Sequence, residues 1–158
     1  HIYGKLNCVQ NMLISAKPKR DSMFSVFDNI PLALTSEAEK LLEFVGLYTK
    51  RYLRAGDLSF GQQKLLELAM ALMNKPKMLL LDEPTAGINP TLINGIIDRL
   101  KKVNKDYGIT LLIIEHNMKV IMNLAHEIYC LANGRVIAHG KPKEIKNNKI
   151  VIDAYLGK

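Results

Sequence analysis

The stretch LSFGQQ at residues 58–63, together with MLLLDE at residues 78–83, decides the fold class of this chain. The first begins with a Ser/Gly turn and opens an amphipathic helix, whose apolar positions repeat at helical spacing. The second contains four apolar residues in a row, typical of a strand buried on both faces, and ends in the carboxylates Asp82 and Glu83. Because the separation leaves room for one helix, a turn and a strand, we expect an α/β fold.

The composition suits one globular domain. The chain has 158 residues, of which 48% are hydrophobic, and this is enough for a domain with a core. No apolar run approaches the roughly 18–20 residues that span a bilayer, and the opening lacks the pattern of a secretory leader. Cys8 and Cys130 lie far apart, so we expect reduced thiols of a cytosolic protein rather than a disulfide framework.

The net charge of +7 raises the question of an anionic partner. The lysine and arginine residues are scattered along the chain, and aromatic residues do not interleave with them as they do on single-stranded nucleic-acid-binding surfaces. We therefore expect a solvated, lysine-rich surface and no nucleic-acid partner. Contact with acidic lipid headgroups is compatible with the same charge.

Before residue 76 the patterns are helical. Asn7 is a candidate cap for a short helix through Ala16, and residues 17–31, which contain two prolines, are expected to be irregular. Ser36 and Glu39 have the spacing of a capping box, which predicts a helix from there to Gly46.

After residue 76 strand and helix patterns alternate. Asn89 is a cap with proline at the first helical position, and it predicts a helix that ends near Gly108. The expected apolar face of this helix comprises Leu92, Ile93, Ile96, Ile97, Leu100 and Val103. Residues 109–114 read as a second buried strand, so the order strand, helix, strand predicts a parallel pair.

The C-terminal part is expected to contain a hairpin. Residues 127–131 and 135–138 flank Asn133-Gly134, a dipeptide that favours a tight turn between antiparallel strands. A short helix from Pro142 and a basic tail are expected to finish the chain.

Polar residues stand where both predicted strands end: Asp82 and Glu83 after the first, Glu115 and His116 after the second. In an open parallel sheet, ligands meet the carboxyl ends of the strands. Asp82 suits Mg²⁺, and Glu83 suits a general base or a group that orients water. His116 is a candidate contact for a γ-phosphate or the attacking water. Such residues also occur where a strand simply passes into a loop, and from the residues alone both interpretations stay open.

Ser59, Gly61 and Gln62 stand at the start of a predicted helix, where unpaired N–H groups and the helix dipole favour phosphate oxygens. Gly61 lets the backbone approach a ligand closely, and the Ser59 hydroxyl can add a hydrogen bond. The alternative is that Ser59 only caps the helix.

The order of these pieces resembles the ATP-binding cassette (ABC) ATPases. Residues 58–62 are similar to the signature motif of that family, residues 82–84 to its Walker B motif, Ala86-Gly87-Ile88-Asn89 to its D-loop and His116 to its switch histidine. Asn89 stands where many members carry Asp, and Phe60 stands where glycine is usual.

The resemblance implies the C-terminal part of an ABC nucleotide-binding domain, with a helical subdomain over residues 1–75 and part of the parallel-sheet core over residues 76–158. It implies a transport ATPase that uses ATP and Mg²⁺. Glu83 would be the catalytic carboxylate, Asp82 the magnesium-side residue and His116 the γ-phosphate contact.

The resemblance also implies partners. Ser59, Gly61 and Gln62 would complete the ATP site of an opposing subunit, so the partner is a homologous ATPase subunit in a dimer. Transmembrane permease subunits would dock around residues 12–33. The protein would be cytoplasmic and peripheral on the inner face of the cell membrane.

Three further segments make the resemblance closer. Residues 82–90, 114–119 and 154–157 look like the ATP-binding subunit of branched-chain amino-acid importers. The lipopolysaccharide-export and urea-import cassettes share parts of this pattern, so both stay open as alternatives.

The phosphate-binding loop of the family, Gly-x-x-x-x-Gly-Lys-Ser/Thr, does not occur in the 158 residues. With the Walker A region absent, we expect the chain to be a fragment that starts just after the glutamine loop of the family. We also expect that this polypeptide alone does not bind or hydrolyse ATP measurably, and that its sheet has exposed edges.

Two other classes of protein remain as alternatives. One is a non-catalytic, truncated module that docks on a partner and donates only residues 59–62. The other is the C-terminal half of a chromosome-maintenance or repair ATPase, which needs a long heptad segment before the signature. Residues 1–57 contain no such segment.

Overall fold

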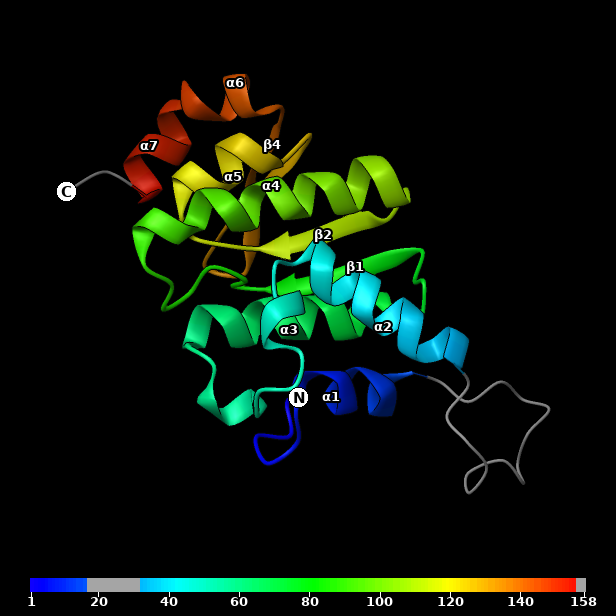
Figure 1. The fold of residues 1–158 in the computed structure, drawn as a ribbon. Helices are drawn as coiled ribbons and strands as arrows, with labels where there is room; N and C mark the ends of the chain where they lie inside the picture. The colour runs from blue at the N-terminus through cyan, green and yellow to red at the C-terminus, as the bar shows by residue number, and fades with distance from the viewer. Residues whose placement is uncertain (17–31, 156–158) are drawn as a thin grey trace.

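A computed structural model describes residues 1–16 and 32–155, so the predicted irregular segment 17–31 lies outside the described residues. The elements are α1 (Cys8–Ser15), α2 (Leu32–Phe44), the short 3₁₀ helices η1 (Tyr48–Lys50) and η2 (Ala55–Asp57), α3 (Phe60–Leu72), β1 (Met78–Asp82), α4 (Pro90–Tyr107), β2 (Thr110–Ile114), α5 (Met118–Leu124), β3 (Ile128–Ala132), β4 (Arg135–Gly140), α6 (Pro142–Lys146) and α7 (Lys149–Tyr155). This mixture of helices and strands confirms the predicted α/β class (Figure 1).

The helices α1, α2 and α3 pack on one another beside the β1–β2 sheet (Figure 1). Asn7 caps α1 as predicted, because its side chain accepts the N–H of Gln10 at 2.8 Å while Gln10 bonds back to the Asn7 N–H at 2.9 Å. Ser59 caps α3 through the same reciprocal arrangement with Gln62. Both helix starts therefore follow from local sequence.

The predicted start of α2 is wrong. The helix already runs from Leu32, so Ser36 and Glu39 lie inside it, and Glu39 forms an ion pair of 3.1 Å with Arg51 instead of capping. The predicted end is confirmed. Gly46 has a φ of +79°, and the N–H of Leu47 reaches back to the carbonyl of Leu42 at 2.7 Å, which closes the last turn.

Strands β1 and β2 form the predicted parallel pair, in a register that aligns Met78 with Thr110 and Asp82 with Ile114. The helix between them, α4, begins at its Asn89 cap with Pro90 in the first position and ends at Gly108, whose φ is +65°. The expected apolar face of α4 is buried except for Leu92, which is mostly exposed.

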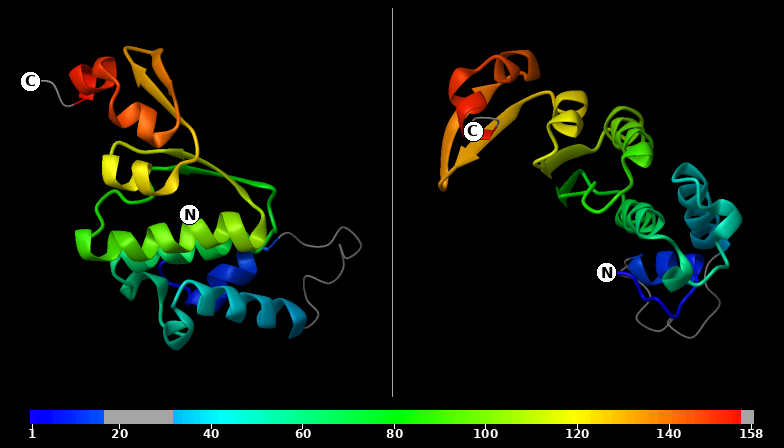
Figure 2. Two further views of the ribbon diagram at one scale, coloured as in Figure 1. Left: turned by 90° about the horizontal axis from the view of Figure 1, so that it is seen from above. Right: turned by 90° about the vertical axis from the view of Figure 1, so that its left-hand side faces the viewer.

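The prediction that these strands are buried on both faces is wrong for the described residues. Leu80 is 72% exposed and Leu112 is 54% exposed, and the register places them side by side on one face. The second view of Figure 2 shows the reason, since α3 and α4 both lie on the opposite face. Leu79 and Ile113 belong to that covered face and pack in the core.

Strands β3 and β4 form the predicted antiparallel hairpin. Asn133 and Gly134 both have positive φ, 49° and 73°, as a type I′ turn requires. Helix α6 starts at Pro142 as predicted, and a further helix that was not predicted, α7, follows it at residues 149–155. The hydroxyl of Tyr155 on α7 donates to the carbonyl of Leu131 on β3 at 2.6 Å.

The buried side chains of the described residues form two clusters. The larger one runs from Cys8 to Val120 and contains residues from both sides of residue 76. The smaller one joins the hairpin to the C-terminal helices through Ile128, Cys130, Ile145 and Val151. The division into residues 1–75 and 76–158 stays a prediction.

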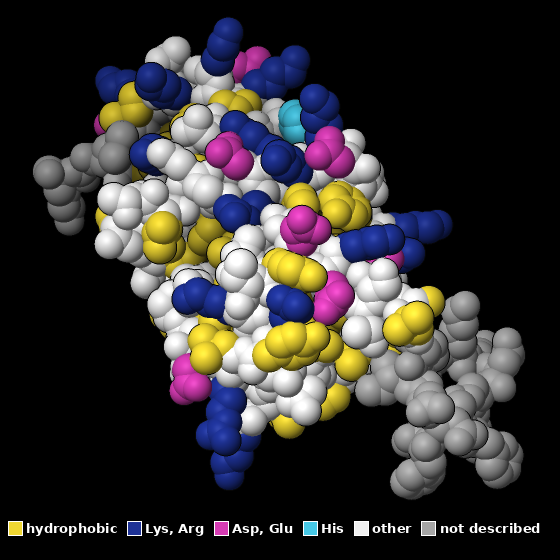
Figure 3. Space-filling model, in the orientation of Figure 1, with side chains coloured by type: hydrophobic (Ala, Val, Ile, Leu, Met, Phe, Trp, Pro, Cys, Tyr) yellow, Lys and Arg dark blue, Asp and Glu magenta, His cyan; other side chains and the backbone are white. Residues whose placement is uncertain are grey.

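Two further properties concern the surface. Figure 3 shows lysine and arginine side chains spread over one face among acidic and apolar side chains. None of the helices in the described ranges is long and apolar enough to span a bilayer.

Candidate functional site

The candidate site begins where the two parallel strands end. The N–H of Glu83, just after β1, donates to the carbonyl of Ile114 at the end of β2 over 2.9 Å. This bond extends the strand pair by one residue and brings Glu83 beside Glu115 and His116. Glu83 has a φ of +45°, a conformation that non-glycine residues rarely adopt and that is found at functional sites.

Glu83 and His116 are in direct contact. Nδ1 of His116 lies 2.9 Å from Oε1 of Glu83, which is hydrogen-bonding distance. Both side chains reach solvent, at 48% exposure for Glu83 and 73% for His116. The pair can therefore meet a ligand that arrives from outside the protein.

Glu115 serves a different role from His116, and its partners were not predicted. Its Oε1 accepts the N–H of Thr85 at 3.1 Å and the Thr85 hydroxyl, while its Oε2 accepts the N–H of Asn117 at 3.2 Å. Thr85 is buried, so these bonds satisfy groups that water does not reach. The signal in the sequence was the acidic residue directly after β2. Because β1 and β2 are parallel, a residue at that position lies close to the loop that follows β1.

Asp82 is the last residue of β1 and is exposed. It lines a cleft of about 220 Å³ that also contacts Lys64 and Glu67 of α3 and Leu100 of α4. The described residues hold no cluster of three His, Cys, Asp or Glu side chains that would enclose a metal. One carboxylate still fits Mg²⁺, because this ion is commonly held by one or two carboxylates together with water and substrate phosphates.

The predicted signature residues lie at the start of α3. The N–H of Gln62 donates to Oγ of Ser59 at 3.4 Å, and the N–H of Ser59 donates to Oε1 of Gln62 at 3.1 Å. Ser59 therefore does cap the helix, and its phosphate-binding role stays a prediction. A methyl group added at Gly61 would lie 3.8 Å from Ile88 and Leu92, an ordinary contact, so packing does not require glycine there.

Residues 86–89, the predicted D-loop, follow Glu83 in the chain and contact the start of α3. Its turn is closed by hydrogen bonds from Ala86 to Glu83 at 3.0 Å and from Ile88 to Thr85 at 3.2 Å. Gly87 has a φ of +69°, and the Phe60 ring lies where a side chain at Gly87 would be, 3.0 Å from an added Cβ. The start of α3 and the D-loop are therefore in contact within one chain.

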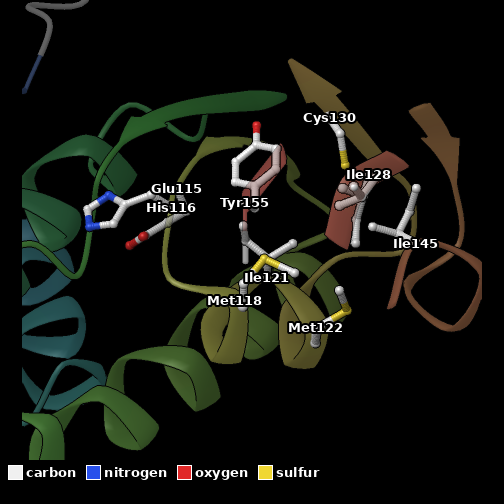
Figure 4. Close-up of a pocket in the computed structure, with 10 residues that line it drawn as sticks. Glu115, His116, Met118, Ile121, Met122, Ile128, Cys130, Ile145 and Tyr155 are labelled. Atoms are coloured by element: carbon white, nitrogen blue, oxygen red, sulfur yellow. The ribbon is translucent and has the colours of Figure 1, made fainter. Parts of the chain in front are cut away.

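A small pocket lies behind His116. Figure 4 shows Glu115 and His116 at one end, Met118 and Ile121 of α5 along one side, and Ile145 of α6 at the far end. Its volume of about 30 Å³ is far below the roughly 300 Å³ of the smallest usual ligand pockets. A ligand of nucleotide size therefore does not fit in this pocket.

Of the two cysteines, Cys130 lines the small pocket and Cys8 lies in the main core. Cys8 and Cys130 are both buried and unpaired. Burial raises the pKa of each thiol, and for Cys8 this outweighs the opposing effects of its backbone hydrogen bond and of Lys50. Such thiols are poor nucleophiles near neutral pH, so neither is a candidate for the reaction.

Two family models match this chain. The model described as ABC transporter matches residues 8–86, which is half of the chain. The model described as branched-chain amino acid ATP-binding cassette transporter matches residues 135–158. The first match covers the signature and Walker B stretches, and the second covers β4, α6 and α7.

Curated proteins and solved structures agree with these matches. A probable branched-chain amino acid transport ATP-binding protein LivG of Archaeoglobus fulgidus is 36% identical over 97% of this chain and 61% of the relative. The high-affinity LivG protein of Salmonella typhimurium is 32% identical over 99% of this chain and 64% of the relative. The ADP-conformation crystal structure of an ATP-binding cassette of an ABC transporter superposes with a TM-score of 0.81 and 32% identity, over 98% of this chain and 64% of that one.

The chain thus spans a little under two thirds of the length of these relatives. The fold, the order of the motifs and the family models all lead to one assignment. The chain belongs to the ABC transporter family, and its relatives include the ATP-binding proteins of branched-chain amino-acid transport.

Proposed function

We propose that these residues act in the ATP-hydrolysing subunit of an ABC transporter that imports branched-chain amino acids. The observation that carries the proposal is the Glu83–His116 contact of 2.9 Å at the joined ends of two parallel strands. The names of the relatives and the match of residues 135–158 support the choice of substrate.

The reaction is the transfer of a phosphoryl group from ATP to water. Glu83 accepts a proton from the water while the water oxygen bonds to the γ-phosphorus. The bond between that phosphorus and the bridging oxygen breaks, and ADP leaves. His116 holds Glu83 in place through Nδ1, and its other ring nitrogen, Nε2, would contact the γ-phosphate. Mg²⁺, held on the protein side by Asp82, would neutralise charge on the phosphates.

The remaining phosphate contacts come from other groups. Ser59, Gly61 and Gln62 would present the start of α3 to the nucleotide of an opposing subunit, which makes a dimer the working form. The 158 residues contain no Gly-x-x-x-x-Gly-Lys-Ser/Thr loop. In an ATP complex, groups other than these residues would therefore supply part of the contacts to the β- and γ-phosphates.

The proposal extends to the assembly. Residues 1–75 would form the helical part on which permease subunits dock, and residues 76–158 would form part of the nucleotide-binding core. The protein would then lie on the cytoplasmic face of the membrane through those permeases. The competing proposals are that the same kind of ATPase drives export of lipopolysaccharide or import of urea.

The test is transport by the complete complex that contains these residues. In proteoliposomes, ATP should drive uptake of labelled leucine, isoleucine and valine, and uptake should stop in the Glu83→Gln complex. ATP hydrolysis without uptake of these amino acids, but with movement of urea or lipopolysaccharide, would overturn the substrate assignment. A wild-type complex that binds ATP without hydrolysing it would favour the non-catalytic alternative.

A further inference from the structure

Glu115 connects the chain segments on both sides of the Glu83–His116 contact. Thr85, which donates to its Oε1 through both N–H and hydroxyl, comes two residues after Glu83. Asn117, whose N–H donates to its Oε2 at 3.2 Å, comes directly after His116. Each carboxylate oxygen of Glu115 therefore holds one of the two loops that carry the pair.

The Glu83–His116 pair needs such support. Both side chains are substantially exposed, and an ion pair or hydrogen bond between exposed side chains is weakly stabilising because solvent screens it and side-chain freedom opposes it. Glu83 also sits at a φ of +45°, which surrounding structure must impose. Thr85 is 5% exposed, so its hydrogen bonds to Glu115 are shielded from water and are stronger than the same bonds would be at the surface.

A second anchor acts from the other side of His116. The Asn117 side chain caps α5 by accepting the N–H of Lys119 at 3.1 Å and that of Val120 at 3.4 Å. Val120 is fully buried in the main core. His116 therefore lies in the chain between Glu115, which is bonded to Thr85, and Asn117, which caps the packed helix α5.

We propose that Glu115 is a positioning residue for ATP hydrolysis, which fixes the distance between Glu83 and His116 without touching the nucleotide. This inference rests on the proposed function. A carboxylate suits the role because it only accepts hydrogen bonds and offers two oxygens, and here three donors from two loops converge on it. Glutamine would keep one accepting oxygen for Thr85 and would turn its NH₂ group toward the N–H of Asn117.

The first experiment reads the geometry without catalysis. In this chain labelled with ¹⁵N-histidine, long-range ¹H–¹⁵N spectra report which ring nitrogen of His116 carries the proton, and the contact with the Glu83 side chain should favour Nδ1. Glu115→Ala should shift His116 to the tautomer mixture found in Glu83→Gln, with Glu115→Gln in between. An unchanged His116 spectrum in Glu115→Ala would overturn the proposal.

The second experiment measures hydrolysis by the complete complex. Glu115→Ala should lower kcat about ten- to a hundredfold, the size of effect known for residues that hold metal ligands in place, with little change in KM for ATP. In a His116→Ala background the same substitution should add almost nothing, because residues that act through one another are not additive. An equal loss of kcat in both backgrounds would show a general structural effect and would overturn the proposal.

Two further variants guard against misfolding. Thr85→Val removes one donor while keeping the shape of the side chain, and it should give a smaller loss of kcat with the same non-additivity. Glu127→Gln is the matched control, since Glu127 also contacts a histidine, His139 at 3.3 Å, but on the distant hairpin. It should leave kcat and the His116 spectrum unchanged. If the wild-type complex hydrolyses no ATP, the proposed function fails, and the spectra of His116 still decide whether Glu115 sets the geometry.

Discussion

His116 and Glu83 are 33 residues apart in the sequence, and their side chains meet at 2.9 Å. The parallel register of β1 and β2 makes this contact possible, because it aligns Asp82 with Ile114 and so brings the two strand ends to one edge. The same edge carries Thr85 and Glu115, whose hydrogen bonds join the two loops below the exposed pair.

Glu83→Gln tests the role of the carboxylate. We expect the variant in the complete complex to lose hydrolysis by about 10²–10⁴-fold, the usual contribution of a positioned general base. ATP binding should persist, since glutamine keeps the size of the side chain and adds no negative charge near the phosphates. Steady-state phosphate release and equilibrium binding of labelled ATP measure the two properties.

Asp153→Asn serves as the control, because Asp153 is an exposed acid on α7 that no interaction links to the strand ends in the described residues. Its hydrolysis rate should equal that of the wild type. A Glu83→Gln complex with near-normal turnover would contradict the assignment of Glu83 as the base.

Much of the fold could be predicted because the signals were local. Asn7, Ser59 and Asn89 each accept a hydrogen bond from an N–H group in the first turn of their own helix. A few neighbouring residues therefore determine where each of these helices starts. The start of α2 was missed because Ser36 and Glu39 imitate a cap, whereas Glu39 is engaged by Arg51 from a later segment. The exposed faces of β1 and β2 were missed because apolar runs do not tell which face a helix covers.

The candidate site was predictable in the same uneven way. Glu83 and His116 could be named from strand ends and from the family resemblance, and the structure brings them together. The role of Glu115 could not be named, since it depends on a hydrogen bond to Thr85, 30 residues away. That partnership follows from strand register, which the sequence leaves open until the pairing of β1 with β2 is known.

Gly87→Ala tests the contact between the D-loop and the start of α3. Alanine at a φ of +69°, with its Cβ 3.0 Å from the Phe60 ring, should lower the free energy of unfolding by about 1–3 kcal/mol. Urea unfolding followed by circular dichroism measures this loss. Phe60→Ala in the Gly87→Ala background should restore only part of the stability, because the backbone strain remains.

Gly61→Ala is the matched comparison. A Cβ at Gly61 would make only ordinary contacts at 3.8 Å, so stability should be nearly unchanged. If the start of α3 approaches a phosphate, hydrolysis by the complete complex should nevertheless fall about a hundredfold, the effect of moving a reacting group by about 1 Å. Normal hydrolysis in this variant would argue that the start of α3 only caps a helix.

The buried thiols predict how stability changes at alkaline pH. Burial raises the pKa of Cys8 and Cys130 in the folded protein, so the unfolded chain loses these protons at lower pH than the folded chain does. The free energy of unfolding should therefore be highest below the ordinary thiol pKa and should fall as pH rises from about 8 to 10. Urea midpoints across this range measure the slope.

Cys8→Ala and Cys130→Ala separate the thiols from the tyrosine and lysine residues that titrate in the same range. Each variant should flatten part of the slope, whatever its effect on stability at pH 7. An unchanged slope in the double variant would show that the thiols do not contribute. In the folded wild type, alkylation of either cysteine should be slow at neutral pH and should become fast in urea.

The exposed face of the β1–β2 sheet predicts association of the isolated chain. Leu80 and Leu112 lie side by side on that face, and among the described residues the sheet has two strands with unpaired outer edges. Large exposed apolar patches and open strand edges favour self-association. Leu80→Gln with Leu112→Gln should therefore reduce the mass measured by light scattering at equal concentration. The change in stability should stay within about 0.5 kcal/mol, as for surface substitutions.

Leu79→Ala, on the covered face, should have the opposite effects on stability and on association. Leu79 lies between the exposed residues Met78 and Leu80 but packs in the core, so its truncation should cost about 2–5 kcal/mol. It should not relieve association, because it leaves the open face unchanged. If the wild-type chain is monomeric with a sharp two-state melt, or if Leu80→Gln unfolds it as Leu79→Ala does, then the open face is covered in solution and this prediction is wrong.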